Sequence, residues 1–597
     1  MQYTRKSFAF TLLLTLACCL SLSGQTITGT FTGTVTDATG AVVPNVKITA
    51  TNTGTNLPAS ATTNRYGVYN LLFLPVGSYN IIAESAGFKK AQTGPFNLET
   101  NQIARVDLKL EIGDATQSVT VDATSVALQT ESTQTGGTLD STKLTSLPLN
   151  GRNFASLTLL VPGAITTNPQ GIATSQRFQA RPFVNGNREQ TNNFMLDGVD
   201  VNDSMDNRIG YQPSVDALEE VKVLTGNIGA DYGNAGGASV MLSIKSGTNA
   251  YHGSAFEFLR NSELDANGYF RNRNLNTAKR NNFKRNIFGG TVGGPIKQNK
   301  LFFFVDYEGT LQRDGGPASA SVAPLTWRNG DLSQFPVNVI DPLTGAPFPN
   351  KQIPASRIVN PVAKKLFSSP NLYPLPNQPG TGPLGISGNY ASTTANTINN
   401  HQADAKVDIH PNEKDSIWAR WSISRYEQFG SAAALPVQMT GGQTGPTTSA
   451  VLNWTRAISS TIVNEARTAY SRVVINDNTN DWSGLLGANG NQSFGISGGQ
   501  PIAGLSSVNL GSGLSGVGNG ASIGSTVDNK FMYYDNLTVQ KGKHLLKMGA
   551  QFTRTQQNRY YAGNNGALGI FNYTSTYTGL DYADFLTDQL SSKGRGA

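Results

Sequence analysis

The sequence predicts a mostly β protein with three parts: a small N-terminal β-sandwich, an α/β domain, and a partial antiparallel β-barrel that crosses a membrane. Three observations lead to this fold class. Short segments rich in β-branched residues recur between turns near the N-terminus. The second half of the chain alternates apolar and polar residues, and its connections switch strictly between short and long. With 597 residues, the chain also exceeds the usual size of one domain.

The composition favours strands and turns and excludes several protein classes. Charged residues make up 14% of the chain and hydrophobic residues 38%, which fits neither a disordered polyelectrolyte nor a helical membrane protein. Glycine occurs 64 times, and turn-forming residues are frequent. The net charge of +7 is scattered, apart from short basic spots such as Lys284-Arg285, so we expect no nucleic-acid partner.

Residues 1–24 have the features of a secretory signal peptide. Arg5 and Lys6 form a basic start, residues 8–22 are nearly all apolar, and small residues follow for cleavage. A lipoprotein signal is the alternative, because Leu16-Ala17 precedes Cys18.

Both cysteines, Cys18 and Cys19, lie in this segment. An exported mature chain would therefore contain no disulfide, no thiolate nucleophile and no Cys-ligated metal. No later apolar run reaches about 18 residues, so a mature chain that enters a membrane must do so as a β-barrel.

Residues 25–112 are expected to form the sandwich, because short strands and turns follow one another at regular spacing. Residues 30–36, 68–74 and 78–84 are candidate strands, and Val46, Ile48 and Ala50 alternate after Pro44. The run Gly33-Thr-Val-Thr-Asp, Gly40, Pro44-Asn-Val, Gly67-Val-Tyr69, Leu74-Pro-Val-Gly77-Ser-Tyr79 resembles the carboxypeptidase regulatory-like domain, a prealbumin-type sandwich with a carbohydrate-binding-like fold.

Residues 113–248 carry a series of motifs in a fixed order. A strand ends in Asp197-Gly198, a Glu-x-Val-type segment contains Glu220 and Val221, Tyr232-Gly233 follows, and a Gly-rich turn at Gly237 leads into an apolar strand that ends at Lys245. This order resembles the α/β plug domain of TonB-dependent receptors, and Leu147-Pro-Leu-Asn-Gly-Arg-Asn-Phe154 resembles the Oar-like subfamily. We expect Val221 and Val223 to face the plug core beside Met241 or Ile244. Gly233 and Gly237 should adopt turn conformations that side chains resist.

The resemblance also implies an energy-coupling box near the start of this region. Gln117-Ser118-Val119-Thr120-Val121-Asp122 resembles the short segment that pairs by strand addition with a TonB-type energising protein of the inner membrane. The alternative is that these residues form the first strand of the plug.

Residues 249–597 contain nine candidate strands with alternating faces. In Leu301, Phe303, Val305 and Tyr307 one face is apolar, whereas Asp306 and Glu308 lie on the other, as in a barrel with lipid outside. The nine candidates are 252–260, 284–295, 301–309, 401–409, 415–427, 449–457, 461–475, 530–540 and 544–556. Their connections alternate strictly between a few residues and long segments, which is typical of periplasmic turns and outer loops. This pattern predicts an outer-membrane protein in contact with lipid, with residues 25–112 in the periplasm.

Nine is an odd number, whereas single-chain bacterial barrels have an even number of strands. Residues 591–597 are polar and lack the terminal aromatic strand of such barrels. We therefore expect only the N-terminal part of a barrel, as a curved, unclosed sheet that leaves the plug partly uncovered. We also expect this fragment alone not to form a stable membrane protein.

No motif in the chain predicts catalysis or a bound cofactor. His410-Pro-Asn-Glu413 matches the His-x-x-Glu of zinc carboxypeptidases but occupies a predicted tight turn. Residues 511–516 match Gly-x-Gly-x-x-Gly without a flanking strand and helix, so we expect a flexible outer loop. Asp197, Asp200, Asp203 and Asp206 lack the spacing of an EF-hand. We expect no enzyme, no cofactor and no metal site.

Three functions fit these observations. The first is an outer-membrane receptor for energised uptake of a bulky nutrient through a plugged barrel, with an unidentified extracellular ligand. The second is an Oar-type adhesion or assembly protein that uses the same barrel without import. The third is an exported carbohydrate-binding or peptidase-related protein.

Overall fold

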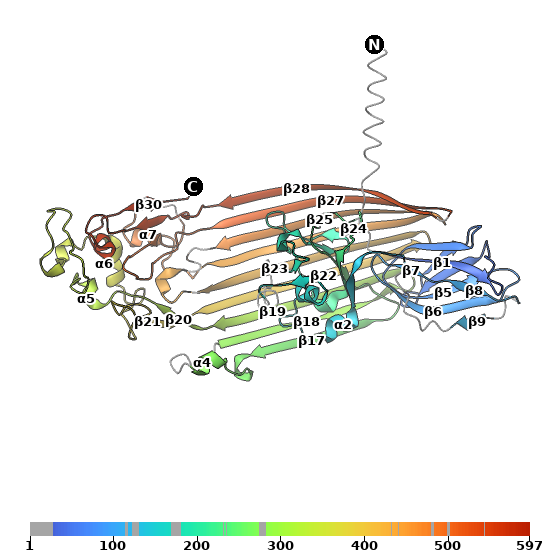
Figure 1. The fold of residues 1–597 in the computed structure, drawn as a ribbon, viewed down its shortest axis with the longest axis horizontal. Coiled ribbons are helices and arrows are strands. Elements are labelled where there is room, and N and C mark those ends of the chain that lie inside the picture. The colour runs from blue at the N-terminus through green and yellow to red at the C-terminus, as the bar shows by residue number, and fades with distance from the viewer. Residues whose placement is uncertain are drawn as a thin grey trace, which may run out of the picture.

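The protein is described by a computed structural model that covers residues 28–596 except 114–117, 122–130, 169–180, 231, 234–235, 274–281, 432, 440, 479–480, 482, 498–501 and 543. The proposed signal peptide, with both cysteines, lies outside these residues. A sandwich lies at one end of a long sheet, a plug lies against one face of that sheet, and packed loops lie at the opposite end (Figure 1).

The sandwich consists of two sheets around an aromatic core. Its strands are β1 (Gly29–Asp37), β2 (Lys47–Asn52), β3 (Pro58–Thr62), β4 (Val68–Leu74), β5 (Gly77–Glu84), β6 (Lys90–Leu98), β7 (Ile103–Arg105), β8 (Leu108–Leu110) and β9 (Ser118–Val121). One sheet joins β4, β1, β7 and β8, and the other has the order β3-β2-β5-β6-β9. Val46, Ile48 and Ala50 are fully buried, as their alternation predicted. Phe31 meets Tyr79 edge to face, with ring centroids 5.7 Å apart.

The plug has a small mixed sheet with short helical segments beside it. Its elements are β10 (Thr135–Asp140), α2 (Ser141–Ser146), the 3-10 helix η2 (Phe154–Leu160), β11 (Ala164–Ile165), β12 (Phe183–Val184), β13 (Asn193–Leu196), β14 (Val199–Asp200), β15 (Leu218–Gly226) and β16 (Ser239–Ile244). The main sheet has the order β10-β15-β16-β13-β14. Val221 and Val223 are buried in the plug core with Ile244, as predicted, whereas Met241 belongs to a separate apolar cluster on the other face.

The long sheet contains nine antiparallel strands, and each predicted strand is present. They are β17 (His252–Asn261), β18 (Asn282–Lys297), β19 (Leu301–Gly315), β22 (Ala395–Asn412), β23 (Asp415–Ser431), β24 (Gly442–Ser459), β25 (Ile462–Asn478), β27 (Gly524–Lys541) and β28 (His544–Tyr561). They pair in chain order from β17 to β28, and in the described part of the chain these two edges do not pair with each other. The predicted unclosed sheet of nine strands is therefore present.

The two faces of this sheet differ as the alternation predicted. Val305 and Tyr307 are 36% and 41% exposed, whereas Asp306 between them is 5% exposed. Trp421 is 49% exposed, whereas its neighbour Arg420 is 2% exposed. The apolar residues thus point outward and the polar ones point toward the plug. Among the described residues, no helix is long and apolar enough to cross a membrane.

The long connections pack together into one body, which we call the cap: residues 317–393, 433–439, 483–497, 502–517 and 562–596. Its core draws on three connections and on the segment after β28, and it includes Trp327, Val437, Phe494 and Phe585. Its helices and strands are β20 (Pro317–Ala320), α5 (Leu325–Arg328), α6 (Pro361–Phe367), β21 (Tyr390–Thr393), α7 (Gly490–Ser493), β26 (Ser507–Val508), β29 (Ile570–Asn572), α8 (Asp581–Leu586) and β30 (Ser592–Gly594); outside the cap, α4 (Tyr269–Arg273) follows β17.

The cap corrects one sequence expectation. Residues 511–516 are an ordered turn, because the Ser512 backbone N–H donates to Asp581 Oδ2 at 2.8 Å and the turn borders the cap core. Glycine spacing alone did not reveal the carboxylate that holds this turn, since Asp581 lies far away in sequence.

Candidate functional site

The first plug motif, Asp197-Gly198, is the turn of a two-residue hairpin between β13 and β14. Both residues have positive φ, 49° and 72°, which is the backbone of a type I′ turn and explains the Asp-Gly pair. Asp197 Oδ1 accepts a hydrogen bond from the Ile244 backbone N–H at 3.1 Å. The side chain therefore ties the hairpin to β16 and fixes the direction of its second oxygen.

The second oxygen, Asp197 Oδ2, contacts the nine-stranded sheet. We call the side of this sheet that faces the plug the wall. Arg420 Nη1 on β23 donates to Asp197 Oδ2 at 2.9 Å, and both side chains are fully buried. Lys406 Nζ lies 3.7 Å from the other oxygen, and Arg467 Nη1 donates to the Gly198 carbonyl at 3.0 Å. The tip of this plug hairpin is thus held by three cations from the inner wall.

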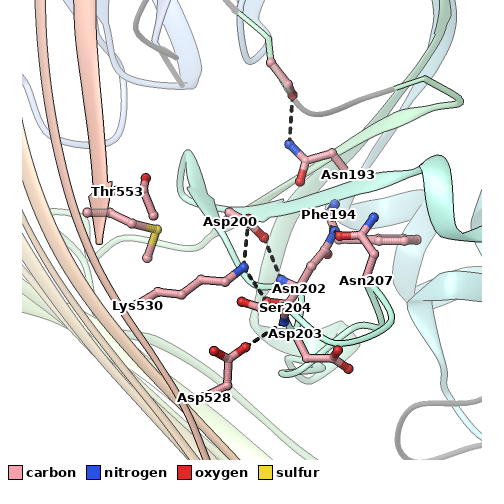
Figure 2. A network of polar contacts seen from close by, with 12 residues as sticks. Asn193, Phe194, Asp200, Asn202, Asp203, Ser204, Asn207, Asp528, Lys530 and Thr553 are labelled. Carbon is pink, nitrogen blue, oxygen red and sulfur yellow. Dashed lines mark hydrogen bonds and ion pairs between the residues drawn. The ribbon is translucent and has the colours of Figure 1, made fainter. Parts of the chain in front are cut away.

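A second polar contact follows directly in the chain (Figure 2). Lys530 Nζ on β27 contacts Asp200 Oδ2 at 3.1 Å and donates to the Asn202 carbonyl at 2.8 Å. The Ser204 backbone N–H donates to Asp528 Oδ2 at 2.6 Å. One strand of the wall therefore offers both a cation and a carboxylate to the segment after the hairpin.

Further contacts join the plug to β19, β22 and β24. Tyr211 Oη donates to Asp404 Oδ2 at 2.7 Å, and Ser214 Oγ donates to Glu308 Oε2 at 2.9 Å. The interface also has apolar contacts. Val199 packs with five residues of the wall, Trp418, Val451, Ala469, Met532 and Tyr534, and Phe304 of β19 packs into the plug core. Polar and apolar contacts thus both join the plug to the wall.

The wall residues of this interface were not singled out from the sequence. Four buried cations point inward from strands whose side chains alternate between the two faces of the sheet: Arg420, Lys406, Arg467 and Lys530. Charged side chains are seldom buried in proteins. The sequence could have indicated these residues, because each is a charged residue at an inward position of a predicted barrel strand. It does not show which plug residue each of them contacts.

The Oar-like segment also contacts the wall. Arg152 forms an ion pair with Asp216 of the plug and stacks over the rings of Phe256 and Phe258 on β17, at 5.1 and 4.2 Å from their centroids. Asn150 Oδ1 accepts from Arg285 Nη2 on β18 at 2.7 Å.

Glu220 belongs to a different interface, between the plug and the sandwich. Its Oε1 accepts from the Thr100 backbone N–H at 2.8 Å, and Lys222 Nζ donates to the Thr100 carbonyl at 2.8 Å. Thr100 Oγ1 and Ser243 Oγ lie 3.0 Å apart. We call these four residues the junction; each is less than a tenth exposed. Burial raises the pKa of Glu220 to about 7, against the lowering effect of the Thr100 hydrogen bond, and lowers the pKa of Lys222.

The remaining plug-motif residues have structural positions. Lys245 Nζ donates to the Asp216 carbonyl at 2.8 Å, and Tyr232 is buried beside Met241. The expectation for Gly233 is wrong, because its φ is not left-handed and an added Cβ would meet nothing within 4 Å. Gly237 also lacks a left-handed φ, but an added Cβ would lie 2.5 Å from Asn192 Oδ1, so close packing explains this glycine.

The candidate coupling box is only partly described, since Gln117 and Asp122 lie outside the described residues. Ser118, Val119, Thr120 and Val121 form β9, which pairs in parallel with β6 at the edge of the sandwich. The alternative that these residues form the first plug strand is wrong, because the plug sheet begins with β10.

The weaker motifs do not converge on a metal or cofactor site. Asp200, Asp203 and Asp206 engage Lys530, Arg208 and Arg181 respectively. The expected tight turn at His410–Glu413 is shorter than predicted, because His410 lies within β22, with its ring 6.2 Å from that of Phe302, and only Glu413 lies in the turn to β23. Within the described ranges, no group of three or more His, Cys, Asp or Glu residues could hold a metal ion.

Comparisons with known families match all three parts. The outer membrane beta barrel domain matches residues 243–597, the carboxypeptidase regulatory-like domain matches 30–111, and the TonB-dependent receptor plug domain matches 129–240. The TonB-dependent transporter Oar of Myxococcus xanthus is 26% identical over 299 residues, which are 48% of this chain and 27% of that protein.

Solved structures with a similar fold include the outer membrane transporter YddB from Escherichia coli and the siderophore receptor PirA from Acinetobacter baumannii. Both are 11% identical in sequence to this chain. The match to YddB covers 73% of this chain and 50% of YddB, with a TM-score of 0.44. The match to PirA covers 72% of this chain and 48% of PirA, with a TM-score of 0.40. The chain thus spans about half the length of these structures. The barrel match alone covers more than half of the chain, and together with the plug and sandwich matches it shows that this outer-membrane protein belongs to the TonB-dependent receptors with an N-terminal carboxypeptidase regulatory-like domain.

Proposed function

We propose that this receptor takes up a bulky nutrient in an energised step, in which a TonB-type protein of the inner membrane displaces the plug. The observation that carries the proposal is the plug–wall interface, where Asp197 meets Arg420 and Asp200 meets Lys530. Ion pairs and hydrogen bonds exchange with water when surfaces separate, so a polar interface favours reversible movement over permanent assembly.

The proposal assigns a role to each part. Residues 249–597 contribute the barrel, with outward residues such as Tyr307 and Trp421 against lipid, and the plug extends from β10 at Thr135 to residue 248. Residues 25–112 lie in the periplasm, because the sandwich contacts the end of the sheet that has short turns: Asn64 Nδ2 donates to the Gly542 carbonyl at 2.9 Å. The cap then faces outward and binds the extracellular ligand. No step in this mechanism needs a catalytic residue, and we propose that the protein is not an enzyme.

An adhesion or assembly role of the Oar type is the alternative. The packed core of the cap favours an adhesion role, because an ordered outer surface is suited to contact with another surface. Import and adhesion differ in their need for the energising protein.

Growth tests separate these roles. We expect a strain that lacks the receptor to lose growth on at least one limiting nutrient among iron chelates, cobalamin, glycans and peptides. A strain that lacks the energising protein should share that defect. If the receptor deletion impairs cell adhesion while growth on every nutrient stays normal, the uptake proposal is wrong.

A further inference from the structure

The sandwich holds the strand that we propose as the coupling box. Ser118 to Val121 of β9 lie in register with Lys90 to Thr93 of β6, and the two strands are parallel. In this sheet β6 pairs with β5 on its other side, so β9 extends a continuous sheet of five strands. A pull along β9 therefore acts first on the backbone hydrogen bonds to β6.

Strand β6 leads directly into the plug contact. It ends at Leu98, and two residues later Thr100 makes the three buried contacts of the junction with Glu220, Lys222 and Ser243. Glu220 and Lys222 belong to β15, and Ser243 belongs to β16, which are two adjacent interior strands of the plug sheet. The chain from β9 to the middle of the plug thus passes through one sheet and one turn.

The sandwich is held less firmly to the surrounding wall. Its contacts there include Asn64 with Gly542, which is exposed, and two hydrogen bonds of Asn249, from its backbone N–H to the Gly54 carbonyl at 2.9 Å and from Nδ2 to the Thr55 carbonyl at 2.7 Å. Hydrogen bonds that are exposed or only partly buried contribute less than contacts excluded from water. A sandwich under load should release these surface contacts before it releases the junction.

We propose that the sandwich is a force-bearing adaptor, which transmits the pull on β9 through β6 and Thr100 to strands β15 and β16 of the plug. This inference rests on the proposed function, because it needs an energising protein that binds β9. It adds that the plug is loaded at these two interior strands through the junction. The covalent connection through residues 122–130 is then a second route.

A pulling experiment tests the adaptor. The full-length receptor is placed in a lipid bilayer, and the periplasmic domain of a TonB-type protein on a force probe serves as the handle. We expect the first extension in the unmodified receptor to come from the plug. Lys222→Met removes the hydrogen bond to the Thr100 carbonyl, so the sandwich should detach first and its detachment should become about tenfold more frequent at equal load. Lys109→Met, an exposed lysine of the sandwich, is the matched control and should change nothing.

A disulfide provides the rescue. Thr100→Cys with Ser243→Cys places two thiols where the hydroxyl oxygens lie 3.0 Å apart, and the mature chain would contain no other cysteine. Added to Lys222→Met, the oxidised pair should return the first extension to the plug, and reduction should reverse this. If oxidation has no effect on the order of events, the junction does not carry the load.

A second cysteine pair tests the position of β9. Gln92→Cys and Thr120→Cys are register partners, so they should cross-link in the oxidised receptor without changing the plug event. Absence of this cross-link, or peeling of β9 before the plug extends, overturns the adaptor. If the TonB-type domain fails to bind the unmodified receptor at all, the proposed function fails instead, so the two outcomes are distinguishable.

Discussion

The plug–wall interface and the cap are both buried, but they are held by different interactions. Where the plug meets the wall, buried ion pairs and hydrogen bonds such as Asp197–Arg420 join the two, beside smaller apolar contacts around Val199 and at Phe304. In the cap, the connections meet through an apolar core around Trp327, whose ring centroid lies 4.6 Å from that of Phe335.

This difference indicates which of the two interfaces separates at the lower cost in free energy. Exposing an apolar core costs about 25 cal/mol for each Å² of surface, with no compensation from water. Separated ions and hydrogen-bonding groups regain water, so a polar interface loses little when it opens into a wet channel. If the receptor takes up a nutrient as proposed, the cap would stay assembled while the plug moves.

The largest expected effect is in the cap. Trp327 is fully buried, so Trp327→Ala should destabilise the cap by about 3–5 kcal/mol through lost apolar contact and a cavity. Limited proteolysis of receptor in intact cells should cut the outer connections faster, with the barrel strands unaffected. Leu325→Ala, on the same helix but 58% exposed, is the control. Equal cleavage of both variants would contradict the role of the apolar core.

Arg420→Met tests the other side of the comparison. It leaves the Asp197 charge buried, which costs about 3 kcal/mol, near the lower end for a broken buried pair because Lys406 remains close. The loosened plug should admit large antibiotics that the outer membrane normally excludes.

A double variant provides the control for this prediction. Asp197→Asn with Arg420→Met removes both charges, and asparagine keeps the acceptor for the Ile244 N–H and tolerates the positive φ. Permeability should return toward normal. If the double variant leaks as much as Arg420→Met, loss of packing and not the stranded charge is the cause.

A smaller effect is expected at Lys530. Lys530→Met removes the donor to Asp200 and to the Asn202 carbonyl, at a cost of about 1–3 kcal/mol. Amide hydrogen exchange of residues 199–208 should accelerate, while β15 and β16 stay protected. Lys547→Met, an exposed lysine on the adjacent strand β28, should leave exchange unchanged. Uniform acceleration across the plug would instead indicate that the hairpin and the sheet open together.

The sequence predicted the elements better than their contacts. All nine barrel strands were predicted, but several extend further at the cap end: β22 begins at Ala395, whereas alternation indicated residue 401. Strand pairing needs only backbone hydrogen bonds, so it continues where the sequence no longer alternates between apolar and polar residues.

Tertiary partners were the missing information. Alternation shows that Arg420 points inward, and the Asp-Gly pair shows a turn, but nothing local relates two residues more than two hundred positions apart. The cap was missed for the same reason, because three connections and the segment after β28, which each look irregular, share one core only after the strands have brought their ends together.

The smallest effect concerns the junction, which is polar but joins the plug to the sandwich instead of the wall. Burial raises the pKa of Glu220 from its ordinary value of 4.5 to about 7, and separation of the sandwich from the plug would return the side chain to water and move its pKa back toward the ordinary value. Between these values the assembled state binds more protons than the separated state, so the junction weakens as the pH rises from 4.5 to 7. Over one pH unit between these two values, the free energy that holds the sandwich on the plug should fall by roughly 1 kcal/mol.

The test is exchange of the Thr100 amide, which donates to Glu220. Protection in the unmodified receptor should fall from pH 5.5 to 6.5 relative to Glu220→Gln, which keeps an acceptor oxygen but does not titrate. Comparing the two proteins at each pH cancels the intrinsic pH dependence of exchange. Lys222 and Glu99 also face Glu220, and both remain in the variant, so any pH dependence they cause is common to both proteins. Parallel profiles for the two proteins would show that Glu220 does not control the junction.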